Sequence, residues 1–426
     1  MQSATPPILP TTPLSVLVIG YVWPEPNSSA AGSHMMSLLR LFKQQHWKVT
    51  FCSPAQMTEH MVDLASEGID SHSIALNDSS FDQYVRHLNP DIVMFDRFMM
   101  EEQFGWRVEQ NCPTALRILD TEDLQCLRNA RHQAVKKNRA MQLTDLYSDL
   151  AKREIASIYR SDLSLIISHY EMDLLQQQFK LPNALIHHLP FMLDLTETPL
   201  TTPDFQTRQH LMMIGNFRHA PNWDSVLQMQ QLWPDIKKKL KEKGHSEAEL
   251  HIYGSYPPPK ATALHNPKSG FHIKGWADDA YEVMQSARLC LAPLRFGAGI
   301  KGKLLDAMAC GTPSITTQIG AEGMSTGQPW PGAIAKSNDE FIQSTVDLYS
   351  NKTLWLQKQA DAPALLEALY DGSKTGPLLI EHIVKLSKNL SEHRLQNFTG
   401  AMLNHHSMKS TQYMSQWIEA KNKINA

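Results

Sequence analysis

The sequence predicts an α/β protein made of two Rossmann-like, doubly wound domains that face each other across a cleft. Short apolar runs rich in Val, Ile and Leu alternate with longer amphipathic stretches, and such alternation indicates parallel sheets covered by helices on both faces. Residues 189–203 interrupt the alternation with prolines among threonines, which is typical of a linker. The alternation then starts again, so we expect a second domain of the same kind.

In the first half of the chain, five apolar runs are candidate strands. They lie at residues 15–19, 48–52, 91–95, 114–119 and 162–167, and a helix is expected at 34–45. In the second half, candidate strands lie at 211–215, 249–253, 270–273, 289–292 and 314–317. Helices are expected there at 222–232, 278–287, 303–309 and 339–348. Ligands of such sheets bind outside the carboxyl ends of the strands, so the loops at those ends are the places to look for a site.

These patterns divide the chain into four parts. Residues 1–13 are expected to be a disordered tail, because four prolines forbid regular structure there. Residues 14–195 form a first, acceptor-binding domain, and residues 196–385 form a second, donor-binding domain. Residues 386–426 are expected to be helices that pack back on the first domain.

Composition excludes several classes of protein. Forty Lys and Arg against 43 Asp and Glu give a net charge of -3, whereas proteins that mainly bind nucleic acid are strongly basic. Five scattered cysteines form neither a disulfide framework nor a zinc motif. His187 and His188 are adjacent, cannot both face one metal well, and are interpreted as surface residues. Without a signal peptide or a long apolar run, we expect a cytoplasmic protein that touches a membrane at most peripherally.

The most informative segment is the glycine-rich loop and helix at residues 292–313. Gly297, Gly299 and Gly302 let the backbone approach a ligand closely, and the following helix N-terminus attracts an anion. Lys301 and Lys303 add mobile cations. Asp306 lies three residues after Lys303, on the same helical face, where a carboxylate can bind the two hydroxyls of a ribose. The loop also fits most of a Walker A motif, but Leu304 stands where Ser or Thr would hold magnesium.

Four pieces of the second half resemble, in order, the donor-binding signature of GT-B fold glycosyltransferases, in particular family 4 (group 1 glycosyl transferases). They are residues 215–222, 252–254, 303–313 and 320–323, each following a candidate strand or the glycine loop. The first half resembles the family only through its opening strand, loop and helix with Gly32.

The resemblance implies a role for each matching residue. Lys303 faces the diphosphate and is a catalytic candidate, Asp306 takes the place of the glutamate that binds the ribose, and Gly32 faces the acceptor and the diphosphate. Relatives often carry a histidine after the strand that here ends at Leu119; which residue replaces it stays open between Asp120, Glu122 and Asp123. Glu122 and Asp123 are therefore further catalytic candidates, although the three acids also fit a helix cap. The remaining donor-binding candidates are Gly215, Asn216, Arg218, Phe296, Gly297, Ala298, Gly299 and Lys301.

The resemblance implies transfer of a hexose or related sugar from a nucleoside diphosphate donor, with retention, to the hydroxyl of a glycan, lipid-linked or small-molecule acceptor. It implies no metal and no cofactor other than the donor as co-substrate. Two alternatives stay open. A sugar-nucleotide epimerase shares the fold, and a catalytically silent binding protein is consistent with Ala298, which stands where the family has its first glutamate.

Overall fold

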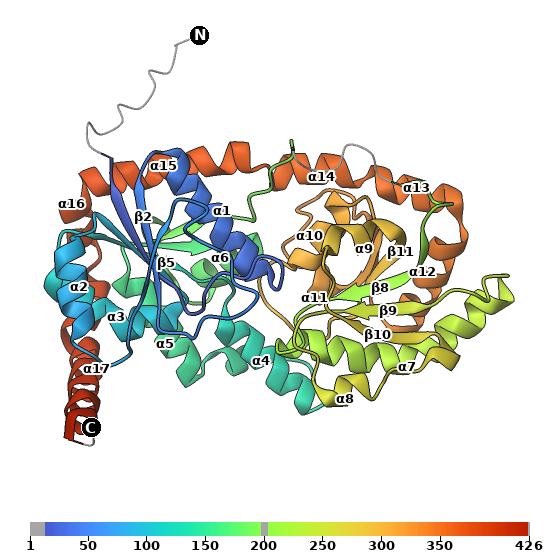
Figure 1. The fold of residues 1–426 in the computed structure, drawn as a ribbon, viewed down its shortest axis with the longest axis horizontal. Coiled ribbons are helices and arrows are strands. Elements are labelled where there is room, and N and C mark those ends of the chain that lie inside the picture. Colours follow the sequence, from blue (N-terminus) through green and yellow to red (C-terminus); the bar gives the residue numbers. More distant parts are fainter. Residues whose placement is uncertain (1–12, 197–202, 425–426) are drawn as a thin grey trace, which may run out of the picture.

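The computed structural model describes residues 13–196 and 203–424, and it contains two domains, each built around one parallel sheet (Figure 1). The first sheet has the strand order β3-β2-β1-β4-β5-β6-β7 and the second the order β10-β9-β8-β11-β12-β13. In both sheets the order reverses beside the first strand, as it does in doubly wound nucleotide-binding folds. The predicted fold class is therefore confirmed.

The strands of the two sheets alternate with helices along the chain. The first sheet comprises β1 Ser15–Ile19, β2 Lys48–Ser53, β3 Asp70–Ser73, β4 Ile92–Asp96, β5 Leu116–Asp120, β6 Leu163–Ile166 and β7 Ile186–His188. The second comprises β8 Gln209–Ile214, β9 Leu250–Tyr253, β10 Phe271–Gly275, β11 Ala287–Ala292, β12 Ser314–Thr317 and β13 Gly332–Ala335.

The helices cover both faces of each sheet. Those of the first domain are α1 Ala30–Gln44, α2 Ser80–Leu88, α3 Phe98–Asn111, α4 Gln125–Lys136, α5 Asp149–Arg160 and α6 His169–Gln177. Those of the second are α7 Ala220–Glu242, α8 Pro259–Thr262, α9 Ala280–Ser286, α10 Gly302–Ala309, α11 Gln318–Ala321, α12 Asn338–Ser350, α13 Lys352–Ala360 and α14 Ala362–Leu369. The chain ends in α15 Gly372–Lys388, α16 Leu390–Gln396 and α17 Phe398–Ile424.

Strand β1 shows why its apolar run is unbroken. Val16 and Val18 pack into the core on one face of the sheet, and Leu17 and Ile19 pack into the core on the other. A strand buried on both faces needs apolar residues at every position. Strand β1 therefore lies at the centre of the sheet, and its carboxyl end lies at the point where the strand order reverses.

The chain returns to the first domain earlier than the sequence indicates. Leu379 and Ile383 of α15 belong to the same core as Val16, so the part of α15 before residue 386 packs with the first domain and not with the second. The two segments that connect the domains pair with each other, because Leu193 N–H donates to Tyr370 O and Gly372 N–H donates to Leu193 O. Apart from Pro13, the predicted tail lies outside the described residues, and so do residues 197–202 of the predicted linker.

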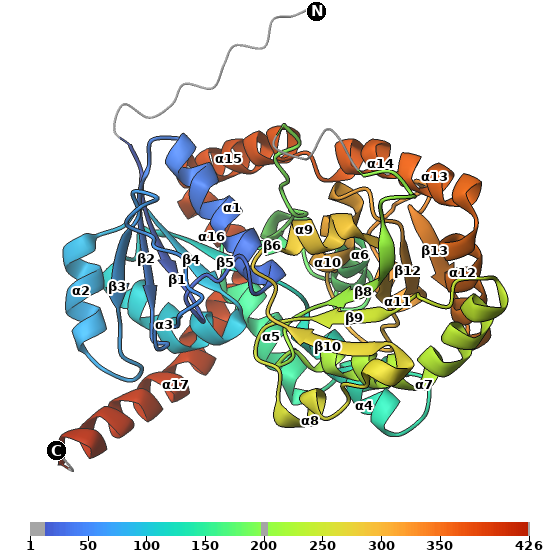
Figure 2. The same ribbon diagram turned by 45° about the vertical axis from the view of Figure 1, so that its right-hand side comes forward.

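Helix α17 runs away from the body of the first domain, toward the C-terminus (Figure 2). Among the helices in the described part of the chain, none is both long and apolar enough to cross a lipid bilayer.

Candidate active site

Both sheets present their point of strand reversal to the junction between the domains. In the first domain this point lies between β1 and β4, and in the second between β8 and β11. The loops that follow these strands carry most of the residues singled out from the sequence. Ligands of doubly wound sheets bind at such points, so the junction is the candidate active site.

In the second domain, the ammonium of Lys303 lies at the start of α10 and reaches the start of α7. Its Nζ donates a 2.6 Å hydrogen bond to Asn222 Oδ1. A Cβ on Gly215 would lie 2.6 Å from Asn222 Nδ2 and 3.0 Å from Lys303 Nζ, so only glycine leaves these two groups together at the end of β8. Burial lowers the pKa of Lys303 to about 8, because the lysine has no carboxylate partner among the described residues to stabilise its charge.

Asp306 follows Lys303 by one turn of α10 and faces a tyrosine. Burial raises the pKa of Asp306 to about 7, and the hydrogen bond from the Tyr281 hydroxyl lowers it in part. A half-buried carboxylate with a single neutral partner can accept further hydroxyl hydrogen bonds. Lys303 and Asp306 therefore place one basic and one acidic group on one face of the same helix.

The other donor-loop candidates are held by neighbouring groups. Asn216 Oδ1 accepts a hydrogen bond from Arg218 N–H, and the Arg218 guanidinium lies 3.7 Å from the centre of the Tyr256 ring. Lys301 is not the mobile cation that the sequence suggests, because it is 8% exposed and its Nζ donates to Gly299 O. Its neighbours Phe296 and Ala298 are buried as well.

In the first domain, the ends of two strands and α1 bring charged side chains together. Asp96 ends β4 and Asp120 ends β5, and His34 of α1 places its Nε2 3.7 Å from Asp120 Oδ1. His34 Nδ1, Asp96 Oδ1 and Asp120 Oδ2 are buried without a hydrogen-bond partner among the described residues. Buried polar atoms without partners are rare in proteins and mark places where a ligand can supply them.

The charges of this cluster shift one another's protonation. Burial alone lowers the pKa of His34, but the negative charge and hydrogen bond of Asp120 outweigh it and raise the pKa to about 9. Burial, followed by the charge of Asp120, raises the pKa of Glu122 to about 8. Burial likewise raises the pKa of Asp96. At neutral pH these raised pKa values favour the protonated forms of His34 and Glu122.

The loops after β4 and β5 are strained. Arg97 has φ 71° and Glu122 has φ 62°, in the left-handed region that side chains other than glycine rarely adopt. Strain of this kind concentrates at functional sites. The helix-cap interpretation of Asp120, Glu122 and Asp123 is wrong. Other acids accept hydrogen bonds from the N–H groups at the start of α4. Leu124 N–H donates to the Glu171 carboxylate, and the N–H groups of Gln125 and Cys126 donate to the Glu154 carboxylate.

Asp123 differs from Glu122 because it is already paired. Burial favours its neutral form, but an ion pair with Arg128 holds the pKa of Asp123 below its usual range. Its Cβ also lies against the glycine loop of the second domain, 2.8 Å from where a Cβ on Gly299 would stand. Asp123 therefore connects the two domains, whereas Glu122 is the freer carboxyl group of this loop.

The two domains touch directly across the expected cleft. Arg131 of α4 forms two hydrogen bonds with the Glu322 carboxylate, of 2.7 and 2.8 Å, and donates another to Gly297 O. Glu171 Oε1 accepts from Gly299 N–H at 2.8 Å. Both views show α4 reaching beneath the second domain, close to α7 and α8 (Figures 1 and 2). The structure is therefore a closed arrangement of the two domains.

The contact between the domains gives one glycine of the loop a second role. A Cβ on Gly302 would lie 2.4 Å from the Cβ of Ala30 in α1. Glycine at this position therefore lets α1 of the first domain pack closely, besides leaving room for a ligand. Ala30 precedes His34 by one turn on the same face of α1. Gly32 donates its N–H to the cap residue Ser29 and packs against the backbone of Glu25, so this N–H is not free for a ligand here.

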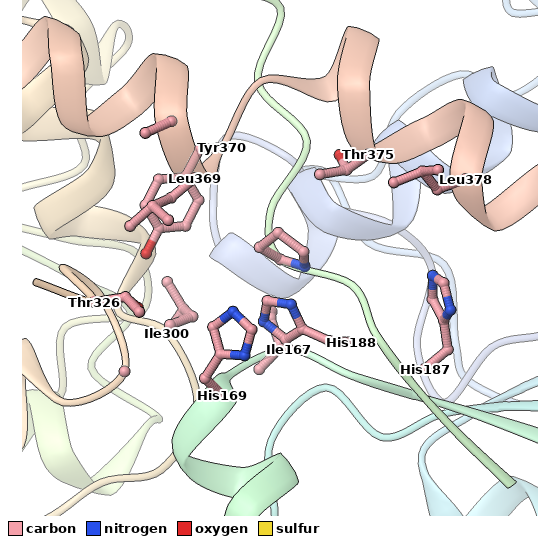
Figure 3. A pocket seen from close by; sticks show the side chains of 13 residues that line it. Ile167, His169, His187, His188, Ile300, Thr326, Leu369, Tyr370, Thr375 and Leu378 are labelled. Carbon is pink, nitrogen blue, oxygen red and sulfur yellow. The ribbon is translucent and has the colours of Figure 1, made fainter. Parts of the chain in front are cut away.

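His187 and His188 are only partly exposed, so the interpretation as surface residues holds only in part. They line a cavity of about 220 Å³ beside the connecting segments. Ile300 of the second domain and Tyr370 of a connecting segment line the same cavity. Figure 3 shows His188 next to His169, with the His187 ring set apart; His187 Nδ1 lies 3.0 Å from His382 Nδ1. Burial lowers the pKa of both His187 and His188 to about 4, so neutral imidazoles fill this side of the junction.

His34 is the residue that the sequence analysis missed. It falls inside the helix expected at residues 34–45, where nothing in the local pattern distinguishes it from an ordinary core residue. It meets Asp120 only because the sheet places α1 beside the end of β5. The signal that could have found it is a polar residue on the apolar face of the first helix after a strand–loop opening.

Comparisons with known proteins agree with this geometry in the second domain. Residues 208–351 match the family model described as "Glycosyl transferases group 1", a segment that contains Gly215, Asn222, Lys303 and Asp306. A search of curated protein sequences finds no significant match.

Solved structures with the same two-domain fold include several transferases, all at low sequence identity. Sucrose-phosphate synthase from Thermosynechococcus elongatus has a TM-score of 0.64 at 13% identity, covering 87% of this chain and 99% of that one. HepE of Anabaena in complex with UDP has a TM-score of 0.64 at 9% identity, covering 88% and 100%. An α-glucosyltransferase in complex with UDP and a 13-mer DNA has a TM-score of 0.57 at 12% identity, covering 88% and 100%.

Proposed function

We propose that this protein is a glycosyltransferase that moves a sugar from a nucleoside diphosphate donor to an acceptor hydroxyl. The observation that carries the proposal is the pair Lys303 and Asp306 on one face of α10, beside Asn222 and Gly215. These four residues lie inside the segment that matches the group 1 glycosyl transferases. The arrangement offers one cation for a diphosphate and one carboxylate for a ribose at the point of strand reversal.

The donor half would act by stabilising the leaving diphosphate. An anion beside Lys303 would replace the Asn222 contact and favour the charged form of the lysine, reversing the effect of burial on its pKa. The first turn of α10 adds the positive end of the helix dipole, which also favours an anion. A preorganised cation and helix N-terminus grow more favourable as charge develops on the leaving group, so we propose that transfer needs no metal ion.

On the acceptor side, we propose that Glu122, Asp120 and His34 bind the acceptor hydroxyls. The unpaired oxygens of Asp96 and Asp120 would accept hydrogen bonds from the acceptor, and the protonated His34 would donate one to it. His34 then takes the place that a histidine after β5 holds in similar enzymes. Asp123, held by Arg128, would position the loop and not touch the acceptor.

We also propose that the transfer retains the configuration at the anomeric carbon. With the acceptor held on the side from which the diphosphate leaves, the departing phosphate oxygen can take the acceptor proton, and the configuration at the anomeric carbon is retained. This proposal is supported by the resemblance of the donor loop and by the closed arrangement, which brings the two loops into contact. Product analysis by NMR of the anomeric proton tests it.

The base and the acceptor class are proposals too. Two of the similar structures hold UDP, so a uridine donor is the first to test. One of them also holds DNA, yet the near-neutral charge of this chain makes nucleic acid an unfavourable partner. We therefore propose a glycan, lipid-linked or small-molecule acceptor.

Helix α17 supports peripheral contact with a membrane, and with it a lipid-linked acceptor. Phe398, Met402, Tyr413 and Trp417 recur at helical spacing and are exposed, Phe398 by 72%. The opposite side packs on the domain, where Ser415 donates to Asn77 and Ser79 donates to Glu419. Aromatic residues with nearby lysines are typical of helices that lie in the headgroup region.

Co-sedimentation with vesicles tests this contact. The protein should sediment with vesicles that contain anionic lipid, and a Phe398→Ser/Trp417→Ser variant should not. Leu143→Ser, which removes an exposed apolar residue elsewhere on the first domain, should sediment like the wild type. Equal sedimentation of the α17 variant would remove the support for a membrane acceptor.

The experiment that tests the function itself combines binding with product analysis. A thermal-shift screen over uridine, guanosine, adenosine and cytidine diphosphate sugars identifies the donor, since a ligand that binds only the folded state raises the melting temperature. Incubation of that donor should then release nucleoside diphosphate slowly without an acceptor. Formation of a free epimer would instead identify an epimerase, and binding with no release would identify a silent binding protein.

A further inference from the structure

A second cluster of ionisable side chains lies at the opposite edge of the second sheet from Lys303. His210 lies near the start of β8, Glu249 immediately precedes β9, His251 lies within β9, and His272 lies near the start of β10. Strands β8, β9 and β10 are neighbours, and His251 and His272 are register partners. Glu249 and His251 are two residues apart and so project from the same face.

The ligand atoms of this cluster are close together. Glu249 Oε2 lies 2.8 Å from His251 Nε2, and Glu249 Oε1 lies 3.3 Å from His272 Nε2. One ring nitrogen each of His210 and His251 and one oxygen of Glu249 lie within 4.8 Å of one another. A tetrahedral zinc ion holds its nitrogen and oxygen ligands at about 2.0–2.2 Å, and therefore about 3.3 Å from each other. The side chains whose ligand atoms lie within 4.8 Å of one another are His210, Glu249 and His251, and the His272 ring lies beside them, 5.3 Å from the His251 ring centre.

Two imidazoles of the cluster already turn a ring nitrogen toward Glu249. The Glu249 N–H donates to His210 Nδ1 at 3.3 Å, and the Glu249 carboxylate lies 2.8 Å from His251 Nε2. A bound cation would replace these contacts. His272 Nε2 is buried and has no hydrogen-bond partner among the described residues.

Two lysines and one strained residue complete the surroundings. Lys237 donates its ammonium to Ser246 O and Ala248 O, and Lys274 is exposed, so both oppose a cation only from a distance. His210 has φ 57°, a left-handed conformation that costs free energy for a residue with a side chain and that concentrates at functional sites.

We propose that His210, Glu249, His251 and His272 form a zinc-binding site. His210, Glu249 and His251 would supply three positions of a tetrahedral ion, and His272, next to Glu249, would supply the fourth. Bound zinc would tie the amino ends of three adjacent strands together and stabilise the second domain. The site is independent of the proposed transfer reaction, because it lies at the edge of the sheet away from the junction.

Titration of the full, tag-free chain with zinc chloride alone, followed by calorimetry, tests this site. We expect one zinc ion per chain and a melting temperature that rises with zinc concentration. Loss of an outer-shell partner already weakens metal binding by about 10–100-fold, so His251→Ala and His272→Ala should each weaken it at least about tenfold.

His265→Ala and His187→Ala are matched controls. The His265 ring packs edge-to-face with the His272 ring and lies outside the group of three close ligands, and His187 belongs to the cavity at the domain junction. Both should bind zinc like the wild type. If His251→Ala does not fold, Glu249→Gln gives the same test while keeping a hydrogen-bonding side chain. A wild-type chain that binds no zinc, or cluster variants that bind it as tightly as the wild type, would overturn the proposal.

Discussion

At the residue scale, the acceptor side of the junction is defined by charges that are buried together. His34, Asp96, Asp120 and Glu122 come from α1 and from the ends of two neighbouring strands, and the pKa values of His34, Asp96 and Glu122 are raised there. Such groups are arranged this way at sites that bind or move protons. In a purely structural cluster, the polar atoms would be expected to satisfy one another.

Glu122 gives this site a pH dependence. Its pKa of about 8 means that the carboxylate is largely neutral at pH 7 and ionised at pH 9. If the ionised form accepts a hydrogen bond from the acceptor, the acceptor KM should fall as the pH rises from 7 to 9. A charge-assisted bond contributes about 1.5–3 kcal/mol, so Glu122→Gln should raise KM at pH 9 by about tenfold or more and flatten its pH dependence.

Steady-state kinetics at several pH values measure this effect. Glu109→Gln changes a partly exposed glutamate of the same domain and should keep the wild-type profile. If Glu122→Gln also keeps that profile, Glu122 does not bind the acceptor.

At the scale of elements, the sequence predicts the central strands well and the edges poorly. Strand β1 was expected at residues 15–19 and is found there, because its continuous apolar run reflects burial on both faces. Strand β3 was not expected, since Asp70–Ser73 is polar and exposed throughout. It forms because its backbone pairs with the edge of β2. The residues of β3 themselves carry no pattern that predicts this pairing.

The site residues also divide into those that local sequence predicts and those that only the strand order brings together. Lys303 and Asp306 are neighbours on one helix, so their spacing alone predicts that they share a face. His34 and Asp120 are far apart in the sequence and meet only through the strand order. The role of Gly302 was predictable only in part. The loop pattern indicates that a ligand approaches the backbone closely at this glycine, but it does not indicate that α1 of the other domain packs there too.

Gly302 provides a prediction for α10 and α1 as packed elements. In Gly302→Ala the new methyl group would collide with Ala30, which should hold the domains apart and misplace the two halves of the site. A misplacement of about 1 Å can cost about a hundredfold in rate, so turnover should fall by tenfold or more. Ala30→Gly combined with Gly302→Ala restores the space.

Initial rates of the single and double variants measure this. The double variant should recover most of the lost rate, less a small cost for glycine in the first turn of α1. If it stays as slow as Gly302→Ala alone, the contact between the helices is not what Gly302 provides.

At the scale of the whole molecule, the closed arrangement must open to admit a donor. Arg131, Glu322 and Glu171 hold it shut in the structure, and the paired connecting segments at Leu193 and Tyr370 are where it can bend. Closure over bound substrates excludes water and assembles the catalytic groups. We therefore expect an open form to bind and the closed form to react.

Arg131→Ala should shift the ligand-free protein toward the open form. Removing one partner of a buried ion pair costs about 3–5 kcal/mol, and here the loss falls on the contact between domains. Small-angle scattering should show a larger radius of gyration than for the wild type. Arg153→Ala, which breaks an ion pair with Glu102 inside the first domain, should scatter like the wild type. Scattering of Arg131→Ala identical to the wild type would show that this contact does not hold the domains together.

The central claim is that α10 binds the donor, with Lys303 at the diphosphate and Asp306 at the ribose. Calorimetric titration with the matching nucleoside diphosphate tests it most directly. Lys303→Ala should weaken binding by about 1.5–3 kcal/mol, or about 10–150-fold, while Lys336→Ala, an exposed lysine of the same domain, should not. Asp306→Asn should weaken the diphosphate but spare its 2′,3′-dideoxy analogue, which has no hydroxyl to bind. Wild-type affinity in Lys303→Ala, or equal weakening of both ligands in Asp306→Asn, would contradict the account.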